Sequence, residues 1–369
     1  MKVAFPHMGN TYIAMKAMFD DLGIKNIVPP KINKRTLEIG TKLSPEQICI
    51  PFKYNIGNYI EAIENGADTI IMIGGIGSCR LGYFGSLSRQ ILKDLGYNVE
   101  FIVLDYSEEK VFDLIRNLKK MMGTKSWLTV FKSVLTILQV LRMVNKFEKL
   151  LLTIRPHENI KGHCDKIYRY MIKSISDAHG SKQIKSILKK AIKDVEGAST
   201  KKNENCLKIG IVGEIYILID DCANLNIAKK LNDLGAEVSK SLNTSEWIEN
   251  LLFYKSIGLN KENYLYKKAA GYINNEIGGH GRETIGSTIH YAQQGYDGVI
   301  QVLPLTCMPE IIAMSMLPKV QEDYNIPVMT VIVDEMTGEA GYITRLEAFT
   351  DLLKKRKEKM KNEEYIFGC

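Results

Sequence analysis

The chain has 369 residues, of which 45% are hydrophobic and 25% charged, so it is long enough for two or three domains that each bury a core. Basic residues number 49 against 42 acidic ones, and the net charge of +7 falls largely in one central segment, which gives little support to nucleic-acid binding. Neither a signal-peptide pattern nor a run of about 18 apolar residues is present, so no export and no membrane span are expected, and a cytoplasmic location is predicted.

The first 120 residues alternate short apolar runs with amphipathic segments. Four apolar runs are predicted strands, namely Lys2–Pro6, Lys25–Val28, Thr69–Ile73 and Val99–Leu104. Three segments with helical spacing separate or follow them, namely Thr11–Leu22, Pro51–Glu64 and Phe84–Leu95. Alternation of this kind predicts βαβ units and a parallel sheet. Residues 1–120 are therefore expected to form a first α/β domain.

Two cysteines of this domain are expected at one edge of its sheet. Cys49 lies at or just before a predicted helix start, and Cys79 lies in the loop GGIGSCR beyond the carboxyl end of a predicted strand. Gly75 and Gly77 lack the third glycine of a dinucleotide fingerprint, and no Gly-Lys-Ser/Thr follows to make a phosphate loop. Gly74, Gly75 and Gly77 instead leave room for backbone amides to approach an anion or an inorganic cluster.

The pattern changes to helices alone from residue 121 to residue 204. Apolar side chains recur there at intervals of three and four residues, at Trp127, Leu128, Phe131, Leu135, Leu138, Leu141 and Val144. Two shorter basic helices are predicted at Lys166–Asp177 and Lys182–Val195. We expect an all-helical insertion. Its basic helices suit packing on the sheet or on one another better than docking on a membrane or a partner.

His157, His163 and Cys164 are candidate metal ligands within the helical segment. Histidine and cysteine are also common on helix surfaces without a metal, and that interpretation stays open.

A second α/β domain is predicted over residues 205–369. Its strands are Leu207–Val212, Val299–Leu303 and Pro327–Val333, and its helices are Asn224–Leu234, about 278–294, about 308–324 and Thr344–Lys361. Residues 244–275 show no clear pattern. His280 and Arg282 lie at a predicted helix N-terminus, which suits an anionic or electron-rich group, although a capping or solvent-facing role is an open alternative.

Cys307 has the most suggestive setting in the chain. A buried strand ends in a turn at Pro304, and Cys307 stands just before a helix that Met308 and Pro309 open. Ligand sites of α/β sheets form at the carboxyl ends of strands, and N–H groups at helix starts stabilise a thiolate. Cys307 is therefore a candidate ligand.

Cys49, Cys79 and Cys307 together would suit one metal cluster if the two domains face each other across a cleft. A structural zinc ion normally takes a fourth protein ligand, whereas a cubane iron–sulfur cluster held by three thiolates leaves one iron open to water or substrate. Three unrelated core cysteines remain an alternative, because none of them forms a C-x-x-C pair. The terminal Cys369 follows a highly charged tail and is not expected to be a ligand.

Five runs of the sequence carry a family resemblance. PEQICIPFK contains Cys49, GADTIIMIGGIGSCR contains Cys79 and DGVIQVLPLTCMPE contains Cys307; the others are KIGIVGEIY at Lys208–Tyr216 and DEMTGEAGYITRLEAF at Asp334–Phe349. They resemble the cluster-bearing component of the 2-hydroxyacyl-CoA dehydratase superfamily. The closest likeness is to its activase-associated branch, which is related to the double-cubane cluster proteins. The resemblance spans the chain outside the helical segment.

The resemblance implies a pair of flavodoxin-like parallel-sheet domains and an oxygen-sensitive 4Fe-4S cluster on Cys49, Cys79 and Cys307. It also implies an ATP-dependent activase partner that supplies low-potential electrons, and a related α/β subunit as a hetero- or homodimer partner. A double-cubane 8Fe-9S cluster needs further thiolates. Cys164, Cys206 and Cys222 do not stand in matching motifs, so one ordinary cubane is favoured.

Two functions follow from this resemblance. The first is a redox enzyme of the anaerobic cell, in which the open iron serves a reductive or dehydratase-type reaction. Here Gly74, Gly75 and Gly77 with His280 and Arg282 would tune the cluster from around it. The second is an electron-relay or cluster-carrying subunit of a larger complex. The sequence identifies neither an acyl-CoA pocket nor a substrate.

Overall fold

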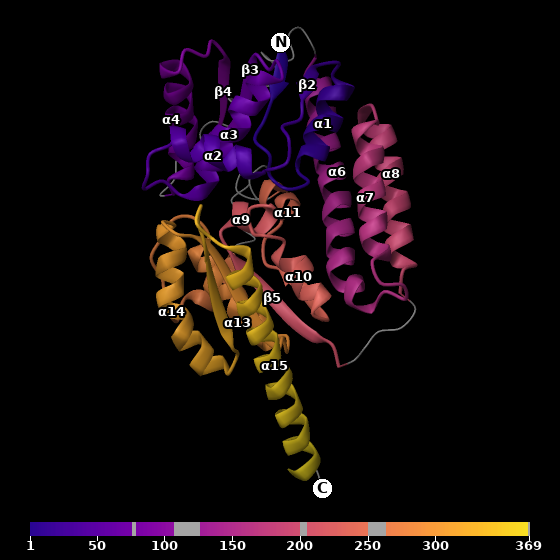
Figure 1. Cartoon of the computed structure of the whole chain (residues 1–369), viewed down its shortest axis with the longest axis vertical. Helices are drawn as coiled ribbons and strands as arrows, with labels where there is room; N and C mark the ends of the chain where they lie inside the picture. Colours follow the sequence, from indigo (N-terminus) through magenta and orange to yellow (C-terminus); the bar gives the residue numbers. More distant parts are fainter. Residues whose placement is uncertain (76–78, 107–125, 200–204, 250–262, 368–369) are drawn as a thin grey trace.

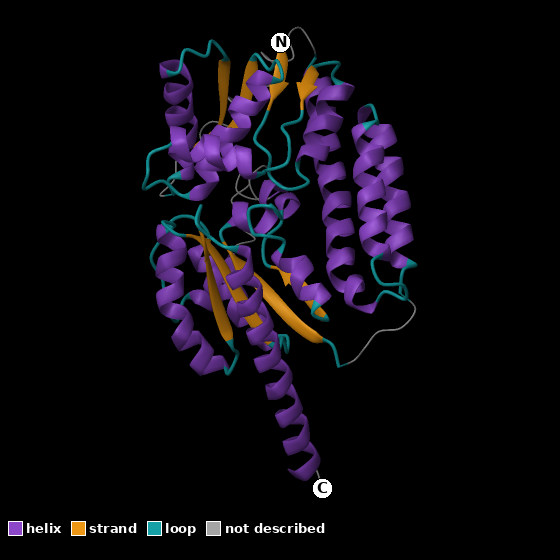
Figure 2. Ribbon diagram, in the orientation of Figure 1, coloured by secondary structure: helices purple, strands orange, loops and turns teal. Residues whose placement is uncertain are grey.

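Two separate four-stranded sheets organise the chain, and every strand pair in them is parallel. The structure is a computed structural model that describes residues 1–75, 79–106, 126–199, 205–249 and 263–367. The strand orders are β2-β1-β3-β4 and β6-β5-β7-β8, and helices flank both sheets (Figure 2). In each sheet the second strand along the chain pairs on one side of the first strand, and the next two strands are added on the other side, as in flavodoxin-like folds. The predicted α/β class with two flavodoxin-like domains is confirmed.

The first sheet contains β1 (Lys2–Ala4), β2 (Lys25–Ile27), β3 (Thr69–Gly75) and β4 (Glu100–Tyr106). Its helices are α1 (Tyr12–Asp21), α2 (Lys34–Leu43), α3 (Ile50–Glu64) and α4 (Leu81–Asp94). All four predicted strands are present. The sequence analysis did not anticipate α2, which starts with a capping box: the Asn33 side chain accepts from the Thr36 N–H, and the Thr36 hydroxyl accepts from the Asn33 N–H.

The second sheet contains β5 (Leu207–Gly213), β6 (Ala236–Lys240), β7 (Gly298–Pro304) and β8 (Val328–Val333). Its helices are α9 (Ile215–Ile219), α10 (Ile227–Asp233), α11 (Thr244–Glu249), α12 (Asn263–Ala269), α13 (Gly281–Gln293), α14 (Met308–Tyr324) and α15 (Glu339–Phe367). β7 is buried along its whole length, as its apolar run predicts. The prediction omitted β6, and α15 begins five residues before the expected Thr344.

Only helices occur in the described residues between β4 and β5. They are α6 (Trp127–Ile154), the short 3-10 helix η2 (Arg155–His157), α7 (His163–Ser176) and α8 (Gly180–Glu196). They share one core with α1, to which Ile13, Ala14 and Ala17 contribute. The long α6 contacts α1 of the first unit and β6 of the second, so this segment runs beside both sheets (Figure 1).

Helix α3 belongs to the cores of both units. Phe52 and Ile56 pack in the core of the first sheet, whereas Ile50 and Tyr54 pack in the core of the second. Lys53, which is 2% exposed, pairs with Glu335 of the loop after β8, with Nζ 2.7 Å from Oε1. The helix that Cys49 heads is therefore fixed by both sheets at once.

A buried polar contact joins the units on the other side of this junction. His7 Nδ1 lies 2.9 Å from Asp220 Oδ2, and the Gly9 N–H donates to the same oxygen. The Tyr216 hydroxyl donates to the His7 carbonyl at 2.8 Å. Burial raises the pKa of Asp220, but the bonds from His7 and from backbone N–H groups outweigh burial, so the net pKa is lowered.

No helix within the described residues combines the length and the apolar composition that crossing a lipid bilayer requires.

Candidate functional site

Cys49 caps the amino end of α3. Its backbone is extended, with φ −65° and ψ 146°, and Pro51 occupies the first turn, a position where a proline costs no hydrogen bond. The side chain is half-buried and packs at the margin of the first core. The sequence analysis placed Cys49 at a helix start, and the structure places it there.

Cys79 follows β3 and stands one residue before Arg80, the N-cap of α4. The Leu81 N–H, in the first turn of that helix, hydrogen bonds to the Cys79 sulfur. The Arg80 guanidinium donates to the carbonyl of Gln47 at 2.8 Å. This bond ties the loop of Cys79 to the loop that leads into Cys49.

Cys307 caps α14, three residues after β7 ends, and is 9% exposed. Its own N–H donates to the Pro304 carbonyl at 3.0 Å, which closes the turn between strand and helix. The Glu310 N–H hydrogen bonds to the Cys307 sulfur. Each of the three cysteines therefore lies at the N-terminus of a different helix, where N–H groups and the helix dipole favour negative charge on sulfur.

One carboxylate, that of Glu214 after β5, lies within electrostatic range of all three thiols. The charge of Glu214 acts on all three cysteines and raises the pKa of each. Cys79 in turn raises the pKa of Cys49 and of Cys307, so the thiols of the two sheets lie within electrostatic range of each other. These positions flank the point in each sheet where the strand order reverses, between β1 and β3 and between β5 and β7.

Burial is the largest cause of the raised thiol pKa values. It raises the pKa of Cys49 to about 12, with Glu214 and Cys79 adding to the shift and Arg80 opposing it. Burial likewise raises the pKa of Cys79 and of Cys307. The thiols are therefore protonated at neutral pH in the metal-free chain. A cation bound among them would convert them to thiolates, which the helix N-termini already favour.

Two carboxyl groups accompany the thiols, and neither was a predicted site residue. Burial raises the pKa of Glu214 and of Glu310 to about 7 each. The Ile217 N–H donates to Glu214 Oε2 at 3.0 Å, and the Thr284 hydroxyl donates to Glu310 at 3.0 Å. An acidic residue directly after a buried strand, as in Val212-Gly213-Glu214, was the sequence signal for the first of them.

Gly74, Gly75 and Gly77 lie at and beyond the carboxyl end of β3. At Gly74 a Cβ would come 2.7 Å from Val103 Cγ1, so the absence of a side chain there serves the packing of β3 beside β4. Gly75 is the last residue of β3. Gly77 lies outside the described residues. The proposed approach of these amides to a cluster stays a prediction.

His280 is the N-cap of α13, as the sequence analysis expected, and this helix start abuts that of α14. A Cβ at Gly281 would lie 2.4 Å from the Pro309 carbonyl oxygen, which only a glycine permits. Arg282 turns to α12 instead: its guanidinium stacks 4.3 Å from the centroid of Tyr266 and lies 3.7 Å from Glu276 Oε1. Within the described residues, no recorded contact joins Arg282 to the three cysteines.

The candidate trio His157, His163 and Cys164 is not assembled as a metal site. The Cys164 thiol is buried in the helical core and its N–H donates to Glu158 Oε2. His157 faces the second sheet, where Nε2 lies 2.8 Å from Glu237 Oε1. This agrees with the alternative that these residues serve the helices without a metal, because residues six apart in a turn followed by a helix need not share a face.

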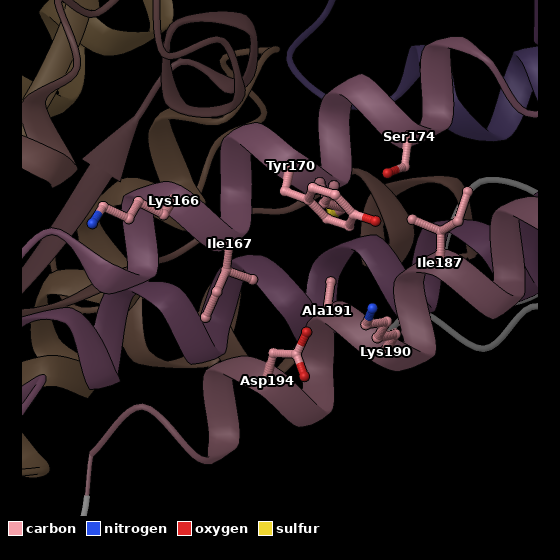
Figure 3. A pocket seen from close by; sticks show the side chains of 9 residues that line it. Lys166, Ile167, Tyr170, Ser174, Ile187, Lys190, Ala191 and Asp194 are labelled. Carbon is pink, nitrogen blue, oxygen red and sulfur yellow. The ribbon is translucent and has the colours of Figure 1, made fainter.

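A hollow of about 330 Å³ lies between α7 and α8 (Figure 3). Tyr170, Ile187 and Lys190 line it together with further residues of the two helices. It belongs to the outer face of the helical segment, far in Figure 1 from the helices that the three cysteines head.

No model of a known protein family matches this chain, and no curated protein shows significant sequence similarity to it.

Proposed function

We propose that the chain is an iron–sulfur protein that holds one 4Fe-4S cluster on Cys49, Cys79 and Cys307, as its resemblance to the 2-hydroxyacyl-CoA dehydratase superfamily implies. One observation supports this above all: three thiols from two sheets lie at the N-termini of three helices, and the charge of Glu214 acts on all three. Each of the three proposed ligands is a thiol at a helix N-terminus, where N–H groups and the helix dipole stabilise negative charge on sulfur. Cubane clusters are held by cysteine thiolates.

When bound, the cluster would supply one-electron chemistry at low potential and, with three protein ligands, one iron with an open position. The residues of this chain do the rest. The Leu81 and Glu310 N–H groups direct hydrogen bonds to cysteine sulfurs, and such bonds tune the potential. Glu214 and Glu310, with pKa values of about 7, hold a proton beside the site near neutral pH.

The proposed reaction is reductive or of the dehydratase type and is driven by electrons from an ATP-dependent activase. Apolar side chains exposed around Cys307 support contact with a partner protein there: Leu305 is 52% exposed and Met308 53%. A cytoplasmic, anaerobic setting fits an oxygen-sensitive cluster with an open iron.

Anaerobic purification followed by iron and sulfide analysis and by EPR of the reduced protein tests the proposal. We expect about four iron and four sulfide per chain, and an EPR signal that appears when a chemically reduced activase and ATP are added, the activase passing one electron to the cluster. Protein that binds no iron under reconstitution, or binds it equally without the three cysteines, would refute it.

Turnover then separates an enzyme from an electron-relay subunit. The reduced protein is mixed with 2-hydroxyacyl-CoA thioesters, and the product is measured. Reduction without turnover, followed by electron transfer to an added acceptor protein, would assign the relay function.

A further inference from the structure

Three side chains able to bind a metal ion meet at the amino edge of the second sheet, the edge opposite Cys307. His157 ends η2, Cys206 directly precedes β5, and Glu237 is the second residue of β6. One ligand atom from each lies within 4.8 Å of the other two. They come from three separate segments of the chain, so only the fold brings them together.

The group is enclosed by protein. Cys206 is 7% exposed and Glu237 is 8% exposed, while the side chain of His157 is 5% exposed. Asn232 fixes the surroundings, because its side-chain amide donates to the carbonyls of Leu152 and Ala236 and its oxygen accepts from Arg155. The end of α6, η2 and the start of β6 are thus already held in one arrangement before any ligand binds.

In the metal-free chain Cys206 keeps its proton, because burial raises the pKa of its thiol and the Glu237 charge adds to that rise. The Glu237 N–H and the Lys357 ammonium oppose the rise without cancelling it. With its proton, the thiol donates to the Gly235 carbonyl at 3.0 Å. A cation that replaced this proton would meet a thiolate, a carboxylate and a neutral imidazole, whose two negative charges balance a divalent ion.

We propose that His157, Cys206 and Glu237 bind one divalent transition-metal ion of the zinc class, with water in the fourth position. Imidazole nitrogen, thiolate sulfur and carboxylate oxygen are the three kinds of ligand that zinc takes. The thiolate disfavours magnesium and calcium, which prefer oxygen. Ligand bonds of roughly 2.0 to 2.3 Å put tetrahedral ligand atoms on the order of 3 to 4 Å apart, a spacing that the present group reaches by small side-chain movements.

The site differs in kind from the one proposed for the cluster. Its ligand atoms are too close together for a cubane, and two of its three ligands are not thiols. Its place at the junction of η2, β5 and β6 means that a bound ion would join the helical segment to the second sheet. It does not depend on whether the chain binds an iron–sulfur cluster.

Cobalt binding to the full-length chain tests this site. In a background with Cys49, Cys79 and Cys307 replaced by alanine, we expect about one Co²⁺ per chain and a thiolate-to-cobalt charge-transfer band. Adding Cys206→Ala should remove the band. Cys164→Ala is the matched control, since Cys164 is equally buried but lies in the helical core, and it should leave the band unchanged. Absence of the band, or a band that survives Cys206→Ala, would overturn the proposal.

Glu237→Gln provides a second variant that keeps the size of the side chain. In the same background without Cys49, Cys79 and Cys307, it should weaken zinc binding at least about tenfold. Far-UV circular dichroism checks that the variant is folded. Equal zinc affinity in a folded Glu237→Gln variant would contradict the assignment.

Discussion

The two sheets have the same strand order but bring different chemistry to their shared junction. β3 and β7 occupy the same position in their two sheets. Cys79 follows β3, and Cys307 follows β7. The helix before β3 begins at Cys49, whereas the helix before β7 begins at His280. The first unit therefore offers two thiols, and the second offers one.

The loops after β1 and β5 extend this comparison. His7 after β1 pairs with Asp220 in a buried contact between the units, whereas the charge of Glu214 after β5 acts on the three thiols. Two units with the same topology thus contribute different groups to the junction: the first supplies two of the three thiols, and the second supplies the carboxyl groups of Glu214 and Glu310. The predictions below test that division.

The largest expected effect is the loss of iron. Cys49→Ser, Cys79→Ser or Cys307→Ser should each lower the iron content from about four atoms per chain to below about one, because a cubane left with two thiolate ligands exposes a second iron. Cys369→Ser and Cys222→Ser should bind as much iron as the unmodified chain. Iron analysis after anaerobic reconstitution measures this, and equal loading of all five variants would show that the ligand assignment is wrong.

Making the first unit resemble the second should change the potential of the cluster. In Cys49→His the imidazole stands where His280 stands in the second unit. Histidine in place of a thiolate should raise the reduction potential by on the order of 100 mV or more. EPR-monitored redox titration gives the value. His280→Ala is the control and should leave the iron content unchanged; a potential unaffected by Cys49→His would mean that Cys49 is not a ligand.

The acidic side of the junction should make the metal-free chain pH-sensitive. The pKa of Glu214 is raised from 4.5 to about 7, so the folded state binds this proton more tightly than the unfolded state does. Its stabilising contribution is complete below about pH 4.5 and is lost as the pH rises to about 7. Burial also raises the pKa values of Glu310 and Glu148 to about 7, so their contributions to stability are lost over the same pH range.

Glu214→Gln should therefore stabilise the metal-free protein at pH 8 by roughly 1 to 3 kcal/mol relative to the unmodified chain, with little difference near pH 4.5. Urea unfolding at the two pH values measures the change. Glu64→Gln is an exposed carboxylate control that should change stability by no more than about 0.5 kcal/mol. A gain in stability that is independent of pH would show that the gain does not come from the raised pKa of Glu214.

The last expected effect concerns the close helix contacts that glycine permits in each unit. A Cβ at Gly57 would lie 2.0 Å from the Thr36 carbonyl oxygen in the first unit, and one at Gly281 would lie 2.4 Å from that of Pro309 in the second. Gly57→Ala and Gly281→Ala should each cost about 1 to 3 kcal/mol in thermal unfolding. Gly338→Ala, where nothing lies within 4 Å, should be nearly neutral. A neutral Gly281→Ala would show that α13 and α14 separate easily.

The sequence predicted those parts whose signal is local. Runs such as Thr69–Ile73 and Val299–Leu303 are apolar because their strands are buried, and Cys79 and Cys307 could be placed since each follows such a run. β6 was not predicted because Glu237 interrupts its apolar residues. The burial of that carboxyl group depends on its contact with His157, which lies 80 residues away in the sequence. The burial of Glu214 and the closeness of Cys206 to His157 and Glu237 could not be predicted for the same reason: their surroundings come from distant segments. The packing role of Gly74 was not predicted either, because the side chain that a Cβ there would meet belongs to Val103 of the neighbouring strand.

The sharing of α3 between two cores has a consequence for biosynthesis. The chain emerges from the ribosome amino end first, and the first sheet can assemble before β5 is made. Until then Ile50 and Tyr54 have no core to enter, because the residues that cover them, such as Tyr216, whose ring stacks 6.2 Å from that of Tyr54, come later in the chain. A nascent first unit would therefore display an apolar helix face beside Cys49, a surface suited to chaperone binding until translation supplies its second sheet.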